Sequence, residues 1–243
     1  MNEARPALAE VPEDWQRALA IVAHPDDLEY GAASAIARWT RLGKQVVYVL
    51  ATRGEAGIGA WPPEQAGPAR EAEERESARL VGVDTVEFLD YRDGVIEYGL
   101  PLRRDLARAI RRHRPELIVG QSFDLVSPAG RWNQADHRAV GMATCDAARD
   151  AANRWIFPEL LAEGLEPWGG VRWILLPGSA EPTHACDVGD DLERGIAALE
   201  AHRAYFEHLG IDFDPAAFLR ERAVATGTRF GCEFATAFRV LSL

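Results

Sequence analysis

The sequence predicts a single Rossmann-like α/β domain, with a mostly parallel sheet flanked by helices. Short apolar runs rich in Leu, Ile and Val alternate along the chain with longer segments of helical spacing. This alternation is typical of a parallel sheet whose strands are buried on both faces. The length of 243 residues and the hydrophobic content of 47% suit one α/β core. We therefore expect one domain over residues 1–243, with an N-terminal extension of about residues 1–14.

The first predicted unit begins at an apolar run over residues 18–23. The segment after it shows helical spacing and ends at Gly43, with apolar residues at Leu28, Ala32, Ile36, Trp39 and Leu42. Residues 45–51 form a second apolar run. Together these segments predict a βαβ unit with two parallel strands.

The rest of the chain continues the alternation. We expect further strands at residues 86–89, 117–119 and 171–176, and helices at residues 69–80, around Arg103, from about Gln134, at 190–209 and at 215–225, the last of which closes the chain. Residues 155–170 contain Pro158, Pro167 and paired glycines, which indicates a connector. Because apolar patterns resume directly after it, this connector is not interpreted as a domain boundary.

Charge and cysteine content exclude several kinds of partner and site. The 38 acidic and 27 basic residues give a net charge of −11, which argues against nucleic acid or an anionic membrane as a partner. The basic pairs Arg103-Arg104 and Arg111-Arg112 are interpreted as the solvated face of an amphipathic helix. No signal peptide and no run of about 20 apolar residues is present, so we expect no membrane span and a cytoplasmic protein. The three cysteines form no CxxC motif, which excludes a zinc ribbon.

The sequence His24-Pro25-Asp26-Asp27 follows the first predicted strand directly. Ligands of open α/β sheets bind at the carboxyl ends of the strands, so these side chains are expected at a site. An imidazole and one carboxylate can bind a cation while the adjacent carboxylate faces a water. The alternative is that an aspartate caps the next helix and His24 is a turn residue.

A third candidate ligand, His137, opens a helical segment that follows the apolar run at residues 117–119. A His/Asp/His set with an open fourth position suits a catalytic zinc, whereas structural zinc sites are more often closed by cysteines. We therefore expect Zn²⁺, with another divalent transition metal as the alternative.

Four motifs together carry a resemblance to a known family. In chain order they are His24-Pro25-Asp26-Asp27, Thr52-Arg53-Gly54-Glu55-Ala56-Gly57, Tyr91-Arg92-Asp93-Gly94 and Ala135-Asp136-His137-Arg138-Ala139. Over most of the chain they resemble the PIG-L/LmbE-like family of zinc-dependent N-acetylglucosaminyl deacetylases. The resemblance implies a metal bound by His24, Asp27 and His137. It also implies Asp26 as the general base, with Asp136 in the catalytic set.

The chain departs from the family pattern at Gln134, where many members have a histidine. A glutamine amide can donate a hydrogen bond to an oxyanion but cannot act as a protonated acid at neutral pH. We therefore expect Asp26 both to take a proton from the attacking water and to return it to the leaving amine. His184 is a second candidate proton donor, and the alternative is a loop histidine without a role.

Residues for substrate binding follow from the same resemblance. Glu55 and Asp93 are expected to accept hydrogen bonds from sugar hydroxyls. Arg70 and His184 are further candidates for this site. The alternative for Arg70 is a surface charge on a helix rich in Glu.

The glycine-rich residues 54–59 raise the alternative of a dinucleotide-binding protein. That pattern requires glycines directly after the first strand, where this chain has Asp26 and Asp27. Carboxylates at that turn would repel a pyrophosphate, so this alternative is not favoured.

The sequence thus predicts hydrolysis of the N-acetyl group of an N-acetylglucosamine-containing small molecule or glycoconjugate, which releases acetate and a free amine. Zinc would acidify the attacking water and polarise the carbonyl. The alternatives are a metal-dependent esterase or phosphatase and a non-catalytic sugar-binding member, although an intact Asp26 weighs against the latter. The resemblance further implies a homo-oligomer, either a trimer or a hexamer.

Overall fold

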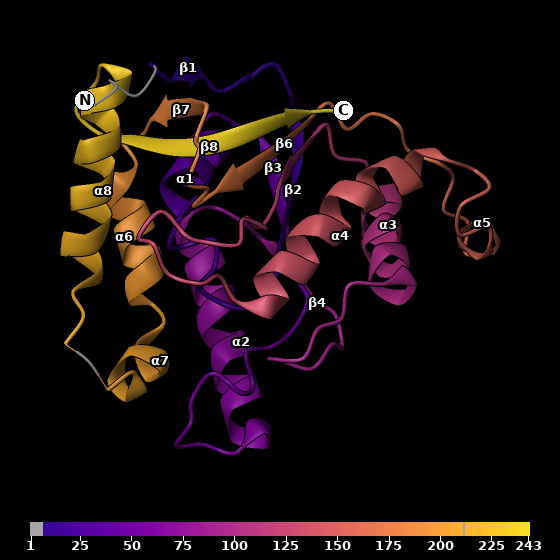
Figure 1. Ribbon diagram of the computed structural model, residues 1–243, viewed down its shortest axis with the longest axis horizontal. Coiled ribbons are helices and arrows are strands. Elements are labelled where there is room, and N and C mark those ends of the chain that lie inside the picture. Colours follow the sequence, from indigo (N-terminus) through magenta and orange to yellow (C-terminus); the bar gives the residue numbers. More distant parts are fainter. Residues whose placement is uncertain (1–6, 211) are drawn as a thin grey trace.

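Strands of one mixed, mostly parallel sheet lie between two layers of helices (Figure 1). The computed structural model describes residues 7–210 and 212–243. The strands are β1 (Ala9–Glu10), β2 (Arg17–Val22), β3 (Gln45–Leu50), β4 (Thr85–Phe88), β5 (Leu117–Val119), β6 (Trp173–Pro177), β7 (His184–Asp187) and β8 (Ala235–Ser242). The helices are α1 (Ala33–Arg41), α2 (Pro63–Leu80), α3 (Leu100–His113), α4 (Ala135–Ala152), α5 (Glu159–Ala162), α6 (Leu192–Glu200), α7 (Arg203–His208) and α8 (Pro215–Phe230).

The strand order of the sheet is β1-β7-β8-β6-β5-β2-β3-β4. The strands from β6 to β4 are all parallel, as the alternation of strands and helices predicts. β8 is antiparallel to both of its neighbours, β6 and β7. Because β2 lies between β3 and β5, the chain builds one side of the sheet first and then the other. The carboxyl end of β2 therefore lies at a topological switch point, where open α/β sheets bind ligands.

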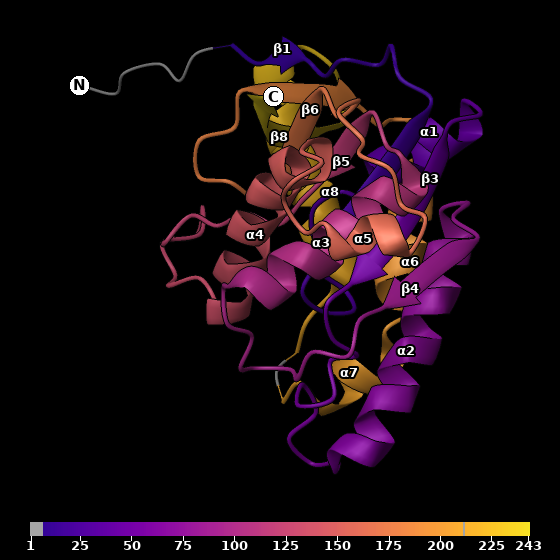
Figure 2. The same cartoon turned by 90° about the vertical axis from the view of Figure 1, so that its right-hand side faces the viewer.

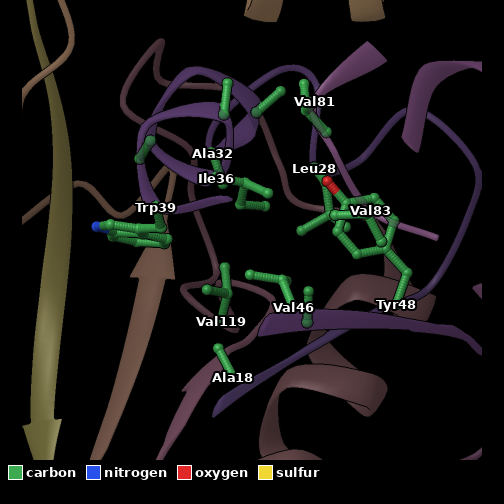
Figure 3. Close-up of a cluster of buried hydrophobic side chains, with 14 of the residues drawn as sticks. Ala18, Leu28, Ala32, Ile36, Trp39, Val46, Tyr48, Val81, Val83 and Val119 are labelled. Carbon is green, nitrogen blue, oxygen red and sulfur yellow. The ribbon is translucent and has the colours of Figure 1, made fainter. Parts of the chain in front are cut away.

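Side chains of β2 alternate between the two halves of the core. Ala18 and Val22 face the layer that contains α1, α2 and α6, where Trp39 is fully buried (Figure 3). Leu19 and Ile21 face the layer that contains α3, α4 and α5. Figure 2 shows the second layer from its own side. Burial on both faces explains why this strand is a continuous apolar run in the sequence.

Helices α1 and α6 approach each other closely at Gly195. A Cβ added there would lie 2.1 Å from Ser34 Oγ and 2.8 Å from the Ser34 backbone nitrogen. Backbone cannot yield as a flexible side chain can, so Gly195→Ala is expected to destabilise the fold by about 2 kcal/mol, although alanine favours helix. Urea unfolding measures the difference, with the exposed Glu200→Ala on α6 as the control. A variant as stable as the wild type would contradict this packing.

The helix after β2 begins later than its apolar spacing predicts. It starts at Ala33, whereas the spacing begins at Leu28, because residues 25–32 form turns. Asp26 has a φ of +83°, which a helix cannot contain. Leu28 is nevertheless fully buried in the same layer as α1. The buried face was therefore predicted correctly, and the backbone that carries it was not.

Two further helices differ from the prediction. α2 begins at Pro63, not near residue 69, because proline suits the first turn of a helix. The helix predicted at 190–209 is two helices, α6 and α7. The chain leaves helical geometry at His202 (φ −79°, ψ 54°), whose side chain is fully buried.

The prediction that a helix closes the chain was wrong, because β8 follows α8 and lies between β6 and β7. β1 and β7 have two and four residues, too few for a periodic pattern. The predicted connector at residues 155–170 contains the short helix α5.

The predicted N-terminal extension lies outside the described residues over 1–6. Its described part adds β1 to the sheet beside β7 and buries Val11. Across residues 7–210 and 212–243, no helix combines the length and the apolar character needed to cross a membrane.

Candidate active site

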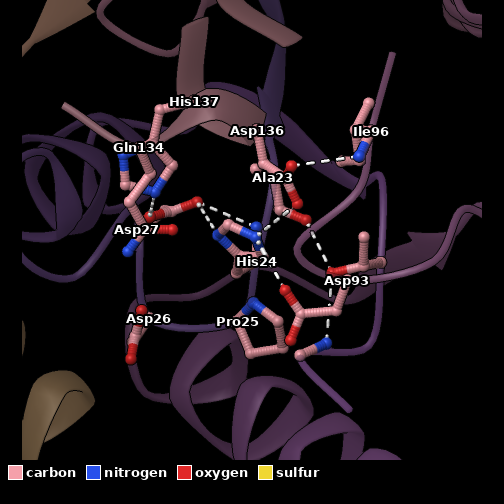
Figure 4. Close-up of polar contacts among 12 residues, drawn as sticks. Ala23, His24, Pro25, Asp26, Asp27, Asp93, Ile96, Gln134, Asp136 and His137 are labelled. Carbon is pink, nitrogen blue, oxygen red and sulfur yellow. Dashed lines mark hydrogen bonds and ion pairs between the residues drawn. The ribbon is translucent and has the colours of Figure 1, made fainter. Parts of the chain in front are cut away.

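Polar side chains gather where neighbouring parallel strands end, at the carboxyl edge of the sheet (Figure 4). β2 leads into His24, Asp26 and Asp27, and the segment after β4 carries Asp93. The segment after β5 leads to the amino end of α4, which holds His137. β5 is the neighbour of β2, and β3 alone lies between β2 and β4. Because these strands are parallel, residues far apart in the sequence meet at the switch point.

His24, Asp27 and His137 form the centre of this group. Nδ1 of His24 lies 3.5 Å from Asp27 Oδ2, and Nε2 of His137 lies 3.0 Å from Asp27 Oδ1. One ligand atom from each residue lies within 4.8 Å of the other two. Two imidazoles and a carboxylate are the donor set of catalytic metal sites that keep one position open. The three side chains could therefore hold a divalent metal.

The outer nitrogen of each imidazole is held by oxygens on its far side. His137 Nδ1 lies 3.0 Å from Asn133 Oδ1, and His24 Nε2 lies 3.2 Å from Asp136 Oδ2. His137 Nε2 is buried and has no hydrogen-bond partner among the described residues, although Asp27 is near. An outer oxygen that orients a ring while the inner nitrogen stays available is typical of metal-binding histidines.

Burial and ion pairing have opposite effects on the pKa values at this centre. Burial acts to raise the pKa of Asp27, but His137 and His24 outweigh it and hold this pKa well below its usual value. Burial acts to lower the pKa of His24, but Asp136, Asp27 and Asp93 outweigh it and raise this pKa well above its usual value. Three carboxylates, those of Asp27, Asp93 and Asp136, thus surround the two imidazoles, which favours a cation.

Asp26 lies beside the centre but is held by a different helix. Arg70 on α2 donates to Asp26 Oδ2 at 3.0 Å, and the Asp26 backbone N–H donates to Glu74 Oε2 at 3.1 Å. Burial raises the pKa of Asp26 to about 6, while the Arg70 guanidinium opposes the rise and Asp27 adds to it. A carboxylate with such a pKa suits a general base near neutral pH.

The structure places Asp136 and Asp93 behind His24. Asp136 is 2% exposed, and its oxygens accept hydrogen bonds from the backbone N–H groups of Gly94 at 2.7 Å and Ile96 at 3.0 Å. Asp93 Oδ1 lies 3.0 Å from His24 Nε2, and Asp93 Oδ2 accepts from the Ala56 N–H at 2.8 Å. Both carboxylates thus orient His24, and any direct role in catalysis or sugar binding stays a prediction.

Glu55, Arg70 and Gln134 lie near the centre in different ways. Glu55 accepts from the backbone N–H of Asp93 at 2.9 Å, so it shapes the loop that carries Asp93. Arg70 is 2% exposed, so the alternative of a surface charge was wrong. Gln134 is exposed at the amino end of α4, close to His137 (Figure 4). Its side chain is therefore accessible to a ligand.

His184 does not lie with the other predicted residues. It begins β7, and β8, β6 and β5 separate that strand from β2. At about 4.8 Å per strand, this places it roughly 19 Å from β2 along the sheet. Its ring contacts the neighbouring Thr183 hydroxyl at 2.8 Å. The structure thus gives no support within one chain for His184 as proton donor or substrate ligand.

Sequence reasoning missed two residues of this site, Asn133 and Glu74. Asn133 lies four residues before His137 and also donates to the backbone oxygens of Ser122 and Asp124 at 3.0 and 2.9 Å. Glu74 lies one helical turn after Arg70. The spacing of four residues in each pair is the signal that could have found them.

Asn133→Ala is expected to weaken metal binding by about 10- to 100-fold, because His137 would lose the oxygen that orients its ring. Titration of the metal-free protein with Zn²⁺ measures the change. Asn133→Asp keeps the acceptor for His137 and removes the N–H donors to Ser122 and Asp124, so retained affinity in this variant would assign the loss in Asn133→Ala to the contact with His137. An unchanged affinity in Asn133→Ala would show that α4 alone orients His137.

A carboxylate beside a cluster of two imidazoles and a carboxylate, at the switch point of an α/β sheet, is the arrangement of a hydrolytic metal centre. Residues 19–148 match the PIG-L family, described as GlcNAc-PI de-N-acetylase. The match spans more than half of the chain, so the protein belongs to the PIG-L family. The family predicted from the motifs is confirmed, and so is the class of enzyme, an amide hydrolase of the deacetylase type.

Relatives in sequence and structure agree with this assignment. A diacetylchitobiose deacetylase from Thermococcus kodakarensis is 27% identical over an alignment of 233 positions, which covers 93% of this chain and 83% of that protein. A 1D-myo-inositol 2-acetamido-2-deoxy-alpha-D-glucopyranoside deacetylase from Kineococcus radiotolerans is 27% identical, over 89% of this chain and 75% of the relative. The solved N,N'-diacetylchitobiose deacetylase from Pyrococcus horikoshii has a TM-score of 0.84 and 27% identity, covering 94% of this chain and 85% of that one.

Proposed function

We propose that the protein is a zinc-dependent deacetylase of small molecules or glycoconjugates that contain N-acetylglucosamine. The observation that carries the proposal is the position of Asp26, a buried carboxylate beside His24, Asp27 and His137 that is bound by Arg70. Two relatives whose names describe N-acetylated sugars, diacetylchitobiose and an acetamido-glucopyranoside, support the substrate class.

Each side chain has a separate task in this proposal. When bound to His24, Asp27 and His137, Zn²⁺ would polarise the acetamide carbonyl and acidify the attacking water. Asp26 takes a proton from this water as its oxygen bonds to the carbonyl carbon. The exposed Gln134 amide donates a hydrogen bond toward the developing oxyanion.

Collapse of the tetrahedral species breaks the C–N bond. Asp26 then returns its proton to the leaving nitrogen, so that acetate and a free amine are released. One carboxylate thus serves first as the base and then as the acid of the reaction. His184 has no task in this scheme, because three strands separate β7 from β2.

Acetate release tests the proposal. The purified protein is stripped of metal with a chelator and assayed with and without added Zn²⁺, on N,N'-diacetylchitobiose and on an inositol conjugate of N-acetylglucosamine. Zinc-dependent release of acetate is expected. Turnover of p-nitrophenyl acetate or p-nitrophenyl phosphate, without release of acetate from the sugars, would favour the esterase or the phosphatase. Tight binding of zinc without turnover of any of these substrates would favour a binding protein.

Gln134→His tests which group protonates the amine. A histidine N–H can replace the amide as a donor to the oxyanion, and Asp26 is expected to supply the proton, so the variant should change kcat by less than about threefold. A marked rise in kcat would mean that the native site lacks an acid that a histidine provides. The control is Gln134→Ala, which should lose the hydrogen bond to the oxyanion and lower kcat about 100-fold.

Cytoplasmic location and self-association as a trimer or hexamer stay predictions. Light scattering coupled to gel filtration would measure the number of subunits, and no described surface decides it. A remote residue such as His184 could approach a site only in a neighbouring subunit, so this measurement also bears on its role.

A further inference from the structure

Asp26 has a backbone conformation that most residues other than glycine avoid. Its φ of +83° makes it one of three non-glycine residues with positive φ in the described ranges. Such conformations are strained, and they persist only where surrounding contacts over-determine them. Strained backbone conformations are often found at functional sites, and Asp26 lies at such a site. The contacts that hold this residue therefore determine where its carboxylate points.

Helix α2 binds Asp26 at two different points. Arg70 donates from one nitrogen to Pro25 O at 2.6 Å and to Asp26 Oδ2 at 3.0 Å. One turn later, Glu74 Oε2 accepts a hydrogen bond from the Asp26 backbone N–H at 3.1 Å. The first contact holds the carboxylate, and the second holds the peptide unit from which the carboxylate projects.

Glu74 is otherwise poorly placed for a polar residue. It is 1% exposed, and its Oε1 has no hydrogen-bond partner among the described residues. Nε2 of the buried His202 lies 3.7 Å from Glu74 Oε2, beyond hydrogen-bond distance. A buried carboxyl group with so few partners is costly to keep. Among the described residues, the Asp26 N–H is the one hydrogen-bond donor to this side chain, and Glu29 and His202 are its other buried polar neighbours.

We propose that Glu74 is a positioning residue, which fixes the left-handed peptide unit at Asp26 and thereby directs the general base toward the reacting centre. This inference rests on the proposed function, in which Asp26 is that base. Misplacement of a reacting group by about 1 Å can cost about 100-fold in rate. Loss of the Glu74 acceptor should therefore lower kcat and leave substrate and metal binding unchanged.

Glutamine is a matched replacement for this side chain. Burial, together with the nearby charge of Glu29, raises the pKa of Glu74 well above its usual value, which favours the neutral form of this side chain. Glu74→Gln keeps the size and one acceptor oxygen for the Asp26 N–H. Glu74→Met keeps the size and removes the acceptor.

Steady-state kinetics on the panel substrate that the wild type deacetylates fastest give the first test. Glu74→Met is expected to lower kcat about 100-fold, with KM and zinc content within twofold of the wild type. Glu74→Gln is expected to recover kcat to within about fivefold. Loss of kcat in both variants, or in neither, would overturn the proposal, and so would parallel loss of zinc in Glu74→Met.

Ser77→Ala is the matched control for a merely structural role. Ser77 is a buried polar residue of the same helix, and its hydroxyl donates to Glu29 Oε1 at 2.6 Å without a contact to Asp26. It should lower the melting temperature and leave kcat unchanged. If Ser77→Ala lowers kcat as far as Glu74→Met does, disturbance of the buried polar cluster would explain both variants, and the proposal fails.

Amide hydrogen exchange at residue 26, followed by NMR, gives a readout that needs no turnover. The Asp26 amide should lose protection in Glu74→Met and keep it in Glu74→Gln; equal protection in both overturns the proposal even if no substrate is found. If Glu74→Met does not fold, Glu74→Asp replaces it, because a side chain one methylene shorter withdraws the acceptor. An inactive Asp26→Asn together with a fully active Glu74→Met would reject this inference and keep the proposed function.

Discussion

Asp26→Asn is expected to lower kcat about 1000-fold and to leave the bound metal unchanged. The amide cannot take a proton from water, and general base catalysis contributes about 10²- to 10⁴-fold to such reactions. Asparagine tolerates positive φ better than most residues, so the turn at φ +83° should persist. Acetate release measures the activity, and metal analysis of the dialysed protein measures occupancy.

The control for Asp26→Asn concerns the charge that it leaves behind. Arg70 is 2% exposed and would lose its anionic partner, which is expected to destabilise the fold. The double variant Asp26→Asn/Arg70→Met removes this unpaired charge and should regain stability while staying inactive. Equal loss of zinc in Asp26→Asn and in a ligand variant would mean that the base and the ligand are assigned the wrong way round.

The central residues of the site could be predicted because each of them follows a parallel strand. Residues in such positions lie at the carboxyl edge of the sheet. A buried parallel strand that ends in His24-Pro25-Asp26-Asp27 must present these groups at the carboxyl edge of the sheet. His137 joins them because β5 is the neighbour of β2 and leads into α4. The pattern of apolar residues indicates where each strand ends, whereas the pairing of β2 with β5 comes from the structure.

Residues that contact the general base or a metal ligand without binding the metal themselves were harder to predict. Glu74 lies on α2, whose charged sequence looks like an exposed helix, yet it reaches the Asp26 backbone across 48 positions of the chain. Asn133 contacts His137 four residues later, but this spacing alone does not tell that either side chain lies at the centre. The contact of Glu74 with Asp26 depends on how α2 packs on the sheet, which is not a property of any local segment.

The edge of the sheet beyond β6 shows the same limit. The eight residues of β8 are only partly buried along most of their length, and they pair in antiparallel fashion with strands that come earlier in the chain. β7 is short, so His184 carried no sign of its strand. The motif could suggest a role for this histidine, but only the strand order shows that three strands lie between β7 and β2.

His137→Ala is expected to abolish metal binding under conditions that saturate the wild type. Only two of the three proposed ligands, His24 and Asp27, would remain. The loss of metal affinity should therefore exceed the 10- to 100-fold expected when an orienting residue such as Asn133 is removed. Metal analysis after dialysis measures the occupancy. His113→Ala is the control, because this histidine pairs with Glu87 on a different part of the fold.

Thermal unfolding gives the same prediction a readout that is independent of activity. At a zinc concentration about 100 times the Kd, binding to the folded state adds about 2.7 kcal/mol to the free energy of unfolding. Chelation should then lower the Tm of the wild type by about 5 to 10 °C. The Tm of His137→Ala should not respond to the chelator, whereas His113→Ala should respond like the wild type. If the chelator lowers the Tm of His137→Ala equally, the stabilising metal binds elsewhere, because a site made of His24, Asp27 and His137 cannot keep its affinity after losing an imidazole.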